Sequence, residues 1–247
     1  MAAQPLESFQ LSGGDALFLD VDGTLAEIGP DPDAIGIDTE TTQALSVLSR
    51  VLGGALVFIS GRDVRDLASR TPDFGWRAGG HGLEIVPPQG ALPAAPAPLP
   101  DDILAPLRAM ERVDGVWLEL KGPVSALHYR AAPEAETACR EAAERAASRQ
   151  SGLTVQQGKM VVEVKPARAH KGTALREICA TPEFAGRRPI MAGDDTTDED
   201  AIIAAQDLGG IGIKVGDGAS DALYHAADPA KIRAWLQREA RTLQALA

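Results

Sequence analysis

Short apolar runs alternate along the chain with longer segments in which apolar residues recur at helical spacing. Four runs have the length and composition of buried strands: ALFLDV (16–21), ALVFIS (55–60), PIMAG (189–193) and GIGIKV (210–215). Three segments have a helical period: 38–51, 171–179 and 229–246. This alternation predicts an α/β core, a Rossmann-like doubly wound parallel sheet whose ligand site lies at the carboxyl ends of its strands.

The middle of the chain has a different pattern. It begins with a loop from Pro87 to Pro100 that holds six prolines, which excludes a central strand or a helix interior there. Helices and closely spaced strand pairs follow, the latter typical of an antiparallel sheet: helices at 101–112 and 133–149, strands at 116–121, 124–130, 153–157 and 160–165. We therefore predict an inserted α+β cap domain at 84–165, between core halves at 1–83 and 166–247.

Two carboxylates lie at the end of the first apolar run and directly after it, in FLDVDGTL (18–25). Gly23 favours a turn directly after them, which leaves Asp20 and Asp22 near one site with backbone amides available for an anion. A hard divalent cation would relieve the repulsion between the carboxylates, and Mg²⁺ suits a site that also takes phosphate oxygens. The alternative is a simple Asx turn capped by Asp22.

A second acidic cluster, GDDTTDED (193–200), follows the third run and enters a helix. One or two acidic residues at a helix N-terminus are ordinary caps, but five exceed that need. Asp194, nearest the strand end, is the best candidate for a metal ligand. Asp198 lies one helical turn later and is predicted to support the metal site, whereas the role of Asp195 stays open.

Hydrogen-bond donors lie between the two acidic clusters. Ser60 ends the second apolar run, with Gly61 and Arg62 directly after it, and Lys171 in HKGT opens a helix. A hydroxyl, an amide and an ammonium are the donors that would hold a phosphoryl group during transfer. Two alternatives are open: Ser60 as the cap of the next helix, and Lys171 as a solvated surface lysine.

In order, DVDGTL, SGR, HKG and GDDTTDED resemble the four motifs of the haloacid dehalogenase (HAD) superfamily of aspartyl phosphotransferases. By this resemblance Asp20 is the nucleophile and Asp22 the general acid and base of a phosphatase. The resemblance further implies that Asp20, the Asp22 carbonyl and Asp194 hold Mg²⁺, and that Ser60 and Lys171 steady the phosphoryl group.

Further motifs resemble the trehalose-6-phosphate phosphatases: GHGLE (80–84), WLELKG (117–122) and GKMVVEVKP (158–166). In a strand 117–121, Trp117, Glu119 and Lys121 share one face, which is either a sugar-binding face or a solvated one with an ion pair. The resemblance favours sugar binding, and it implies sugar contacts through Glu119, Lys121 and Glu163. His81, His128 and Arg130 are further candidates, of which His128 and Arg130 could equally lie on the surface. Gly61 and Arg62 are predicted to bind the phosphoryl group of the substrate.

The resemblance thus implies hydrolysis of a phosphorylated disaccharide to trehalose and phosphate, functionally coupled to a trehalose-phosphate synthase. Two rivals remain. One is hydrolysis of another sugar phosphate by the same core, such as sucrose phosphate or mannosyl-3-phosphoglycerate. The other is a noncatalytic sugar-phosphate sensor, although such a protein is expected to have lost a catalytic group, and here all are present.

The net charge restricts the classes of partner that are expected, and the cysteine content bears on the expected compartment. With 24 Lys and Arg against 35 Asp and Glu, the net charge is −11, which disfavours nucleic acid and anionic membranes as partners. No stretch has the length of a membrane span, and the first residues lack the pattern of a secretory signal. The two cysteines, Cys139 and Cys179, are predicted to be buried reduced thiols, which favours a cytoplasmic protein.

Overall fold

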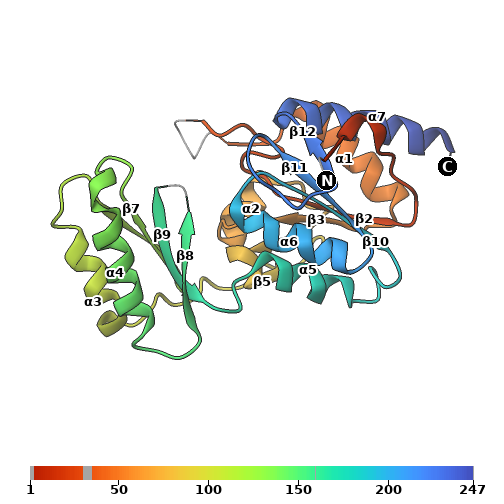
Figure 1. Cartoon of the computed structure of the whole chain (residues 1–247). Helices are drawn as coiled ribbons and strands as arrows, with labels where there is room; N and C mark the ends of the chain where they lie inside the picture. The colour runs from red at the N-terminus through yellow and green to blue at the C-terminus, as the bar shows by residue number, and fades with distance from the viewer. Residues whose placement is uncertain (1–2, 30–34, 159, 247) are drawn as a thin grey trace. The chain divides into compact units, whose positions relative to one another are not determined.

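The computed structural model describes residues 3–29, 35–158 and 160–246. The chain divides into two compact units (Figure 1). Unit 1, the core, comprises Met1–Leu92 and His170–Ala247, and unit 2 comprises Pro93–Ala169.

The core contains an eight-stranded sheet in the order β1-β12-β11-β10-β2-β3-β4-β5. Every neighbouring pair is parallel except β4 with β5. The strands are β1 (Gln4–Pro5), β2 (Asp15–Leu19), β3 (Leu56–Ile59), β4 (Trp76–Gly79), β5 (Glu84–Val86), β10 (Arg188–Gly193), β11 (Ile211–Val215) and β12 (Tyr224–Ala226). From β2 the chain proceeds to β3 on one side and later returns to β10 on the other, so the strand order reverses at β2 and a ligand crevice is expected there.

Helices cover both faces of the core sheet. Helix α1 packs against α7, and α5 packs against α6 on the opposite face (Figure 1). The core helices are α1 (Thr39–Val51), α2 (Val64–Arg70), α5 (Lys171–Cys179), α6 (Thr196–Asp207) and α7 (Pro229–Leu246), with 3-10 turns at η1 (Leu6–Ser8) and η3 (Gly80–Gly82). The predicted doubly wound α/β core is confirmed.

Burial explains why the central strands are continuous apolar runs. Leu17, Phe18 and Leu19 of β2 are fully buried because both faces of the parallel sheet are covered. Each such side chain contributes about 1.5–3 kcal/mol through burial. These rigid strands fix the positions of the residues that follow them.

Unit 2 is an antiparallel sheet with two helices on one face. Its strand order is β6-β7-β9-β8. The elements are α3 (Asp101–Met110), β6 (Trp117–Lys121), β7 (Val124–His128), η4 (Pro133–Ala135), α4 (Glu136–Ala147), β8 (Leu153–Gly158) and β9 (Val161–Pro166). Leu118, Leu127 and Val162 point from the sheet into a hydrophobic cluster with both helices. The predicted α+β insertion is therefore present as a compact unit with its own core.

The predicted boundaries of the insertion at 84 and 165 differ from the observed ones. Residues from 84 onward were expected in the cap, but β5 pairs antiparallel with β4 and belongs to the core sheet. At the other end, β9 runs to Pro166 and pairs there with Leu153, so the unit extends past 165. The boundaries depend on which strand β5 and the end of β9 pair with, and this pairing cannot be recognised from the sequence of either short segment.

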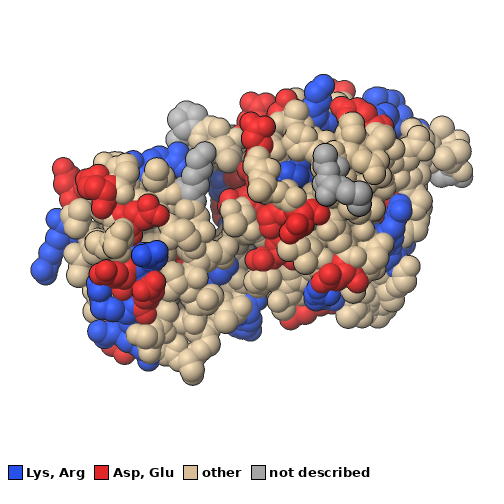
Figure 2. All heavy atoms as spheres, in the orientation of Figure 1, with Lys and Arg blue, Asp and Glu red and all other residues tan. Residues whose placement is uncertain are grey.

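The surface carries side chains of both charges (Figure 2), and both cysteines are free thiols. Acidic and basic side chains both occur across the face in Figure 2, so cations are available locally despite the net charge of −11. Among the described residues no helix combines the length and apolarity that crossing a bilayer requires. Both cysteines are free; Cys139 is buried as predicted, whereas Cys179 is only partly buried.

Candidate active site

The carboxyl ends of β2 and β10 meet at the point where the strand order reverses. Asp20 follows β2 directly, and its backbone N–H donates to the carbonyl oxygen of Ala192 in β10 at 3.0 Å. Asp194 follows β10. The register of the two strands, with Leu19 opposite Ala192, therefore brings the two carboxylates to one edge of the sheet.

A tight loop after β2 fits closely against Asp194. Val21 is fully buried, and its carbonyl oxygen accepts from the N–H groups of Leu25 and Ala26, which closes the loop. Gly23 adopts a φ of +84°, and a Cβ atom at this position would lie 2.2 Å from Asp194 Oδ2. Only glycine allows both this backbone conformation and this approach.

Lys171, at the start of α5, joins the two acidic motifs. Its ammonium donates to Asp20 Oδ1 at 2.8 Å and to Asp198 Oδ1 at 2.7 Å. The three side chains are at most 6% exposed. Burial alone would lower the pKa of Lys171, but Asp198 and Asp20 raise it, so the group stays an ammonium. The alternative of a solvated surface lysine is therefore wrong.

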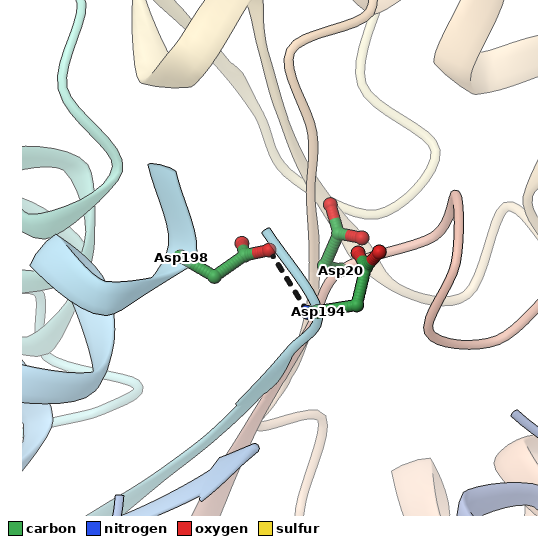
Figure 3. Close-up of side chains that lie close together, drawn as sticks. All are labelled: Asp20, Asp194 and Asp198. Atoms are coloured by element: carbon green, nitrogen blue, oxygen red, sulfur yellow. Dashed lines mark hydrogen bonds between the residues drawn. The ribbon is translucent and has the colours of Figure 1, made fainter. Parts of the chain in front are cut away.

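Asp20, Asp194 and Asp198 form a carboxylate cluster whose ligand atoms lie within 4.8 Å of one another. Figure 3 shows the Asp20 and Asp194 carboxylates side by side, with Asp198 directed at the Asp194 backbone. Burial and the Asp198 charge raise the pKa of Asp20 well above its usual value and that of Asp194 to about 6. This excess of negative charge in a buried all-oxygen site is the environment that a hard divalent cation stabilises, so the residues fit a metal.

Asp198 has less freedom to bind a metal than the other two carboxylates. Its Oδ1 accepts from Lys171, and its Oδ2 accepts from the N–H groups of Asp194 and Asp195 at 3.1 and 3.0 Å. A Cβ atom on Gly193 would lie 2.3 Å from this side chain. Asp198 thus holds both Lys171 and the loop that carries Asp194.

The remaining acidic residues of the motif have structural partners. Asp195 is the N-cap of α6 and forms a capping box with Asp198, which gives the role that the sequence left open. Glu199 accepts from Ser220 and from the N–H of Asp221. Asp200 pairs with His170 at 2.9 Å.

Arg62, in the loop after β3, pairs with Asp22 rather than facing an open site. Its Nε and Nη2 both donate to the Asp22 carboxylate at 2.7 Å, and its Nη1 donates to Asp66 at 2.7 Å. Asp22 is absent from the described carboxylate cluster, and its predicted metal contact through the carbonyl stays a prediction. The bidentate pair instead fixes the direction of the Asp22 carboxylate.

Ser60, Gly61 and His81 come together beside Arg62. Ser60 is buried, and its Oγ accepts from the N–H of Arg62 at 3.0 Å; Asp63 caps α2, so Ser60 is not the helix cap. His81 is buried at a φ of +57° in η3, and a Cβ atom on Gly61 would lie 2.8 Å from its ring. His81 therefore belongs to the core, against the Ser60 loop.

Lys214 is a buried cation that the sequence interpretation missed. It lies in β11, is 5% exposed, and donates to the backbone carbonyl oxygens of Asp194 and of Val215, the latter at 3.0 Å. Its charge counters the rise in the pKa of Asp194. A lysine in the apolar run 210–215 was the available signal, because lysine is rarely buried without a partner.

The polar face of unit 2 brings together most of the predicted sugar contacts. Strand register places Glu119 and Glu163 on either side of Ala126. Glu119 accepts from Lys121 at 3.0 Å and lies 2.9 Å from His128 Nε2. Burial raises the pKa of Glu119, but the contacts with His128 and Lys121 outweigh it and hold the pKa below its usual value. Glu119 therefore stays a charged acceptor.

Arg130, like His81 in the core, lies apart from this strand face. It is exposed, in the turn after β7, two residues beyond His128. The ion pair of Glu119 with Lys121 is also what we would expect if this strand face were merely solvated and bound no sugar. Geometry alone thus leaves both interpretations of this face standing.

Solved structures of other proteins share the fold of this chain. A solved structure titled the C. albicans trehalose-6-phosphate phosphatase C-terminal domain is 21% identical, with a TM-score of 0.75 and coverage of 93% of each chain. A phosphatase of the HAD superfamily from Bacteroides thetaiotaomicron is 16% identical, with a TM-score of 0.61 and coverage of 93% of this chain and 95% of that one. Both establish the HAD fold.

Sequence comparison goes further than the fold. The "Trehalose-6-phosphate phosphatase" of Escherichia coli (strain K12) is 37% identical over 246 residues, which cover 98% of this chain and 92% of that protein. A family model described as trehalose-phosphatase matches residues 18–229, a span that holds both acidic motifs, Lys171 and all of unit 2. The predicted phosphatase is confirmed by these matches, and the chain belongs to the trehalose-phosphatase family.

Proposed function

We propose that this chain hydrolyses trehalose 6-phosphate to trehalose and phosphate through a phosphoaspartyl intermediate on Asp20, with Mg²⁺ as the metal. One observation carries the proposal: a buried ammonium, Lys171, joins Asp20 to Asp198 beside a third carboxylate at the crevice. Family membership and the name of the E. coli relative support the substrate.

In the first step, a carboxylate oxygen of Asp20 attacks phosphorus and the bond from phosphorus to the sugar oxygen breaks. Asp22 gives its proton to that oxygen, so trehalose leaves as a neutral alcohol. Before substrate binds, both Asp22 oxygens accept from Arg62, which requires the carboxylate form. For the acid step this pair must therefore open, and Asp22 must take up a proton from solvent as substrate binds. Lys171 orients Asp20 and offers positive charge to the phosphoryl oxygens.

In the second step, Asp22 takes a proton from water, and the water oxygen attacks phosphorus and releases phosphate from Asp20. Ser60 accepts from the Arg62 N–H, which leaves its own hydroxyl proton free for a phosphoryl oxygen. Mg²⁺ held by Asp20, Asp194 and the Asp22 carbonyl would neutralise charge on the phosphoryl group. Asp198 accepts a hydrogen bond from Lys171 and so keeps the Lys171 ammonium in place beside Asp20.

For recognition, we propose that the polar face of unit 2 contacts the sugar hydroxyls through Glu119, Lys121 and Glu163, with His128 holding Glu119 in place. A charged acceptor next to an ammonium donor suits a hydroxyl-rich ligand. We further propose a cytoplasmic setting, supported by the two free cysteines, and functional coupling to the synthase that supplies the substrate.

Phosphate release on a panel of esters tests this assignment. We expect trehalose 6-phosphate to exceed sucrose phosphate, mannosyl-3-phosphoglycerate and glucose 6-phosphate by at least about tenfold in kcat/KM, because we propose that the polar face of unit 2 binds the hydroxyls of trehalose. Chelation of the metal should stop turnover, and Mg²⁺ should restore it. A clear preference for another ester would refute the substrate, and binding without any release would indicate a sensor.

A further inference from the structure

Trp117 opens β6, an edge strand of the unit 2 sheet. Its indole stacks on the imidazole of His128, with ring centroids 4.0 Å apart and planes 7° apart. The residue is nevertheless 53% exposed. By contrast, Trp235 is buried in the core, and Trp76 packs edge-on against Phe184.

The hydrophobic core of unit 2 does not account for this tryptophan. Trp117 lies on the same side of β6 as Glu119 and Lys121, whereas Leu118 points to the helices. Stacking on His128 explains one ring face as a cross-strand pair that stabilises the sheet edge. It does not explain why more than half of a large aromatic side chain remains in water.

His128, on which Trp117 stacks, is also in contact with charged side chains. His128 lies 2.9 Å from Glu119, which accepts from Lys121 at 3.0 Å. An apolar ring held in one orientation therefore stands beside a carboxylate and an ammonium on a single face. A sugar ring has the matching chemistry, an apolar face of C–H groups with a rim of hydroxyls.

We propose that Trp117 is a specificity-determining residue that stacks on a pyranose ring of the bound disaccharide. The inference rests on the proposed function and deepens it. The side chains beside it, Glu119 and Lys121, bind the hydroxyls of the same ring. His128 positions the indole from behind, and the exposed area of Trp117 becomes buried when the sugar binds.

Two variants of Trp117 separate stacking from sheet stability. Trp117→Phe keeps an aromatic ring and should change trehalose affinity little. Trp117→Ala should weaken trehalose binding by about tenfold in calorimetry, and should raise KM for trehalose 6-phosphate more than it lowers kcat. The matched control is Leu120→Ala: Leu120 lies on the same strand, points to the opposite face and is 44% exposed, so its removal should leave both values unchanged.

Tryptophan fluorescence gives a readout that sheet stability would not change. Trehalose should shift the emission of the wild-type protein, and the shift should disappear in Trp117→Phe, in which the remaining tryptophans are Trp76 and Trp235. Unchanged trehalose affinity and KM in Trp117→Ala would overturn the inference, even if that variant melts at a lower temperature. If Trp117→Ala does not fold, an unshifted emission in the wild-type protein overturns it.

These outcomes are separable from those of the proposed function. Wild-type hydrolysis of trehalose 6-phosphate together with unchanged Trp117 variants would contradict only the stacking role. Absence of that hydrolysis in the wild-type protein would contradict the proposed function and the stacking role with it.

Discussion

Replacing Asp20 by Asn should reduce phosphate release from trehalose 6-phosphate by at least about 10³-fold, because the amide cannot act as the nucleophile. The fold should stay intact, since Asn has the same shape and its oxygen can still accept from Lys171. Burial and Asp198 raise the pKa of Asp20, so the folded protein disfavours this charge and its removal should not lower the melting temperature. Phosphate release and thermal unfolding are measured on the same preparation.

The matched control for this variant is Asp207→Asn. Asp207 ends α6 and pairs with Arg176 at 2.6 Å on the surface, so its loss should leave turnover unchanged. Substantial Mg²⁺-dependent turnover in Asp20→Asn would show that another group attacks phosphorus.

Replacing Lys171 by Met should remove activity and also destabilise the core. The ammonium is buried between Asp20 and Asp198, and its loss leaves both carboxylates without their shared cation. Breaking a buried pair in this way typically costs about 3–5 kcal/mol. Denaturant unfolding of both proteins, followed by a probe of the core, measures the difference.

A second substitution tests the cause of this destabilisation. Adding Asp20→Asn to Lys171→Met removes one of the two unpaired carboxylates, so the double variant should be more stable than Lys171→Met alone. Lys231→Met, which removes an exposed lysine on α7, is the control and should unfold like the wild-type protein. A Lys171→Met protein as stable as the wild type would contradict the buried bridge.

Much of the fold could be predicted from local pattern. Strands β2, β3, β10 and β11 are apolar runs because both faces of the sheet are covered, and burial is visible in composition. Strand β4 was missed because its sequence contains a charged residue, Arg77. The burial of Arg77 is possible because its guanidinium donates hydrogen bonds to Thr71, and the local sequence does not indicate these bonds. Strands β1 and β12 were also missed, since each is short and paired through tertiary contacts. Helix α2 is the helix that was expected after Ser60.

The candidate site shows the same division. Asp20, Asp194 and Lys171 were found because each stands at the end of a strand or the start of a helix, a position that sequence can indicate. The pairing of Arg62 with Asp22 joins residues 40 positions apart, and nothing local to either residue encodes it. The support that Lys214 gives to the Asp194 backbone depends likewise on the neighbouring strand.

Trapping the phosphorylated enzyme tests most directly whether Asp20 is the nucleophile. In Asp22→Asn, para-nitrophenyl phosphate should still phosphorylate Asp20, because its leaving group needs no acid, whereas the loss of the base slows hydrolysis of the intermediate. We expect a burst of one nitrophenolate per protein, and acid quenching followed by peptide mass spectrometry should locate the phosphate on Asp20. Phosphate on any other residue, or equal release of nitrophenolate and phosphate without labelled protein, would contradict the phosphoaspartyl mechanism.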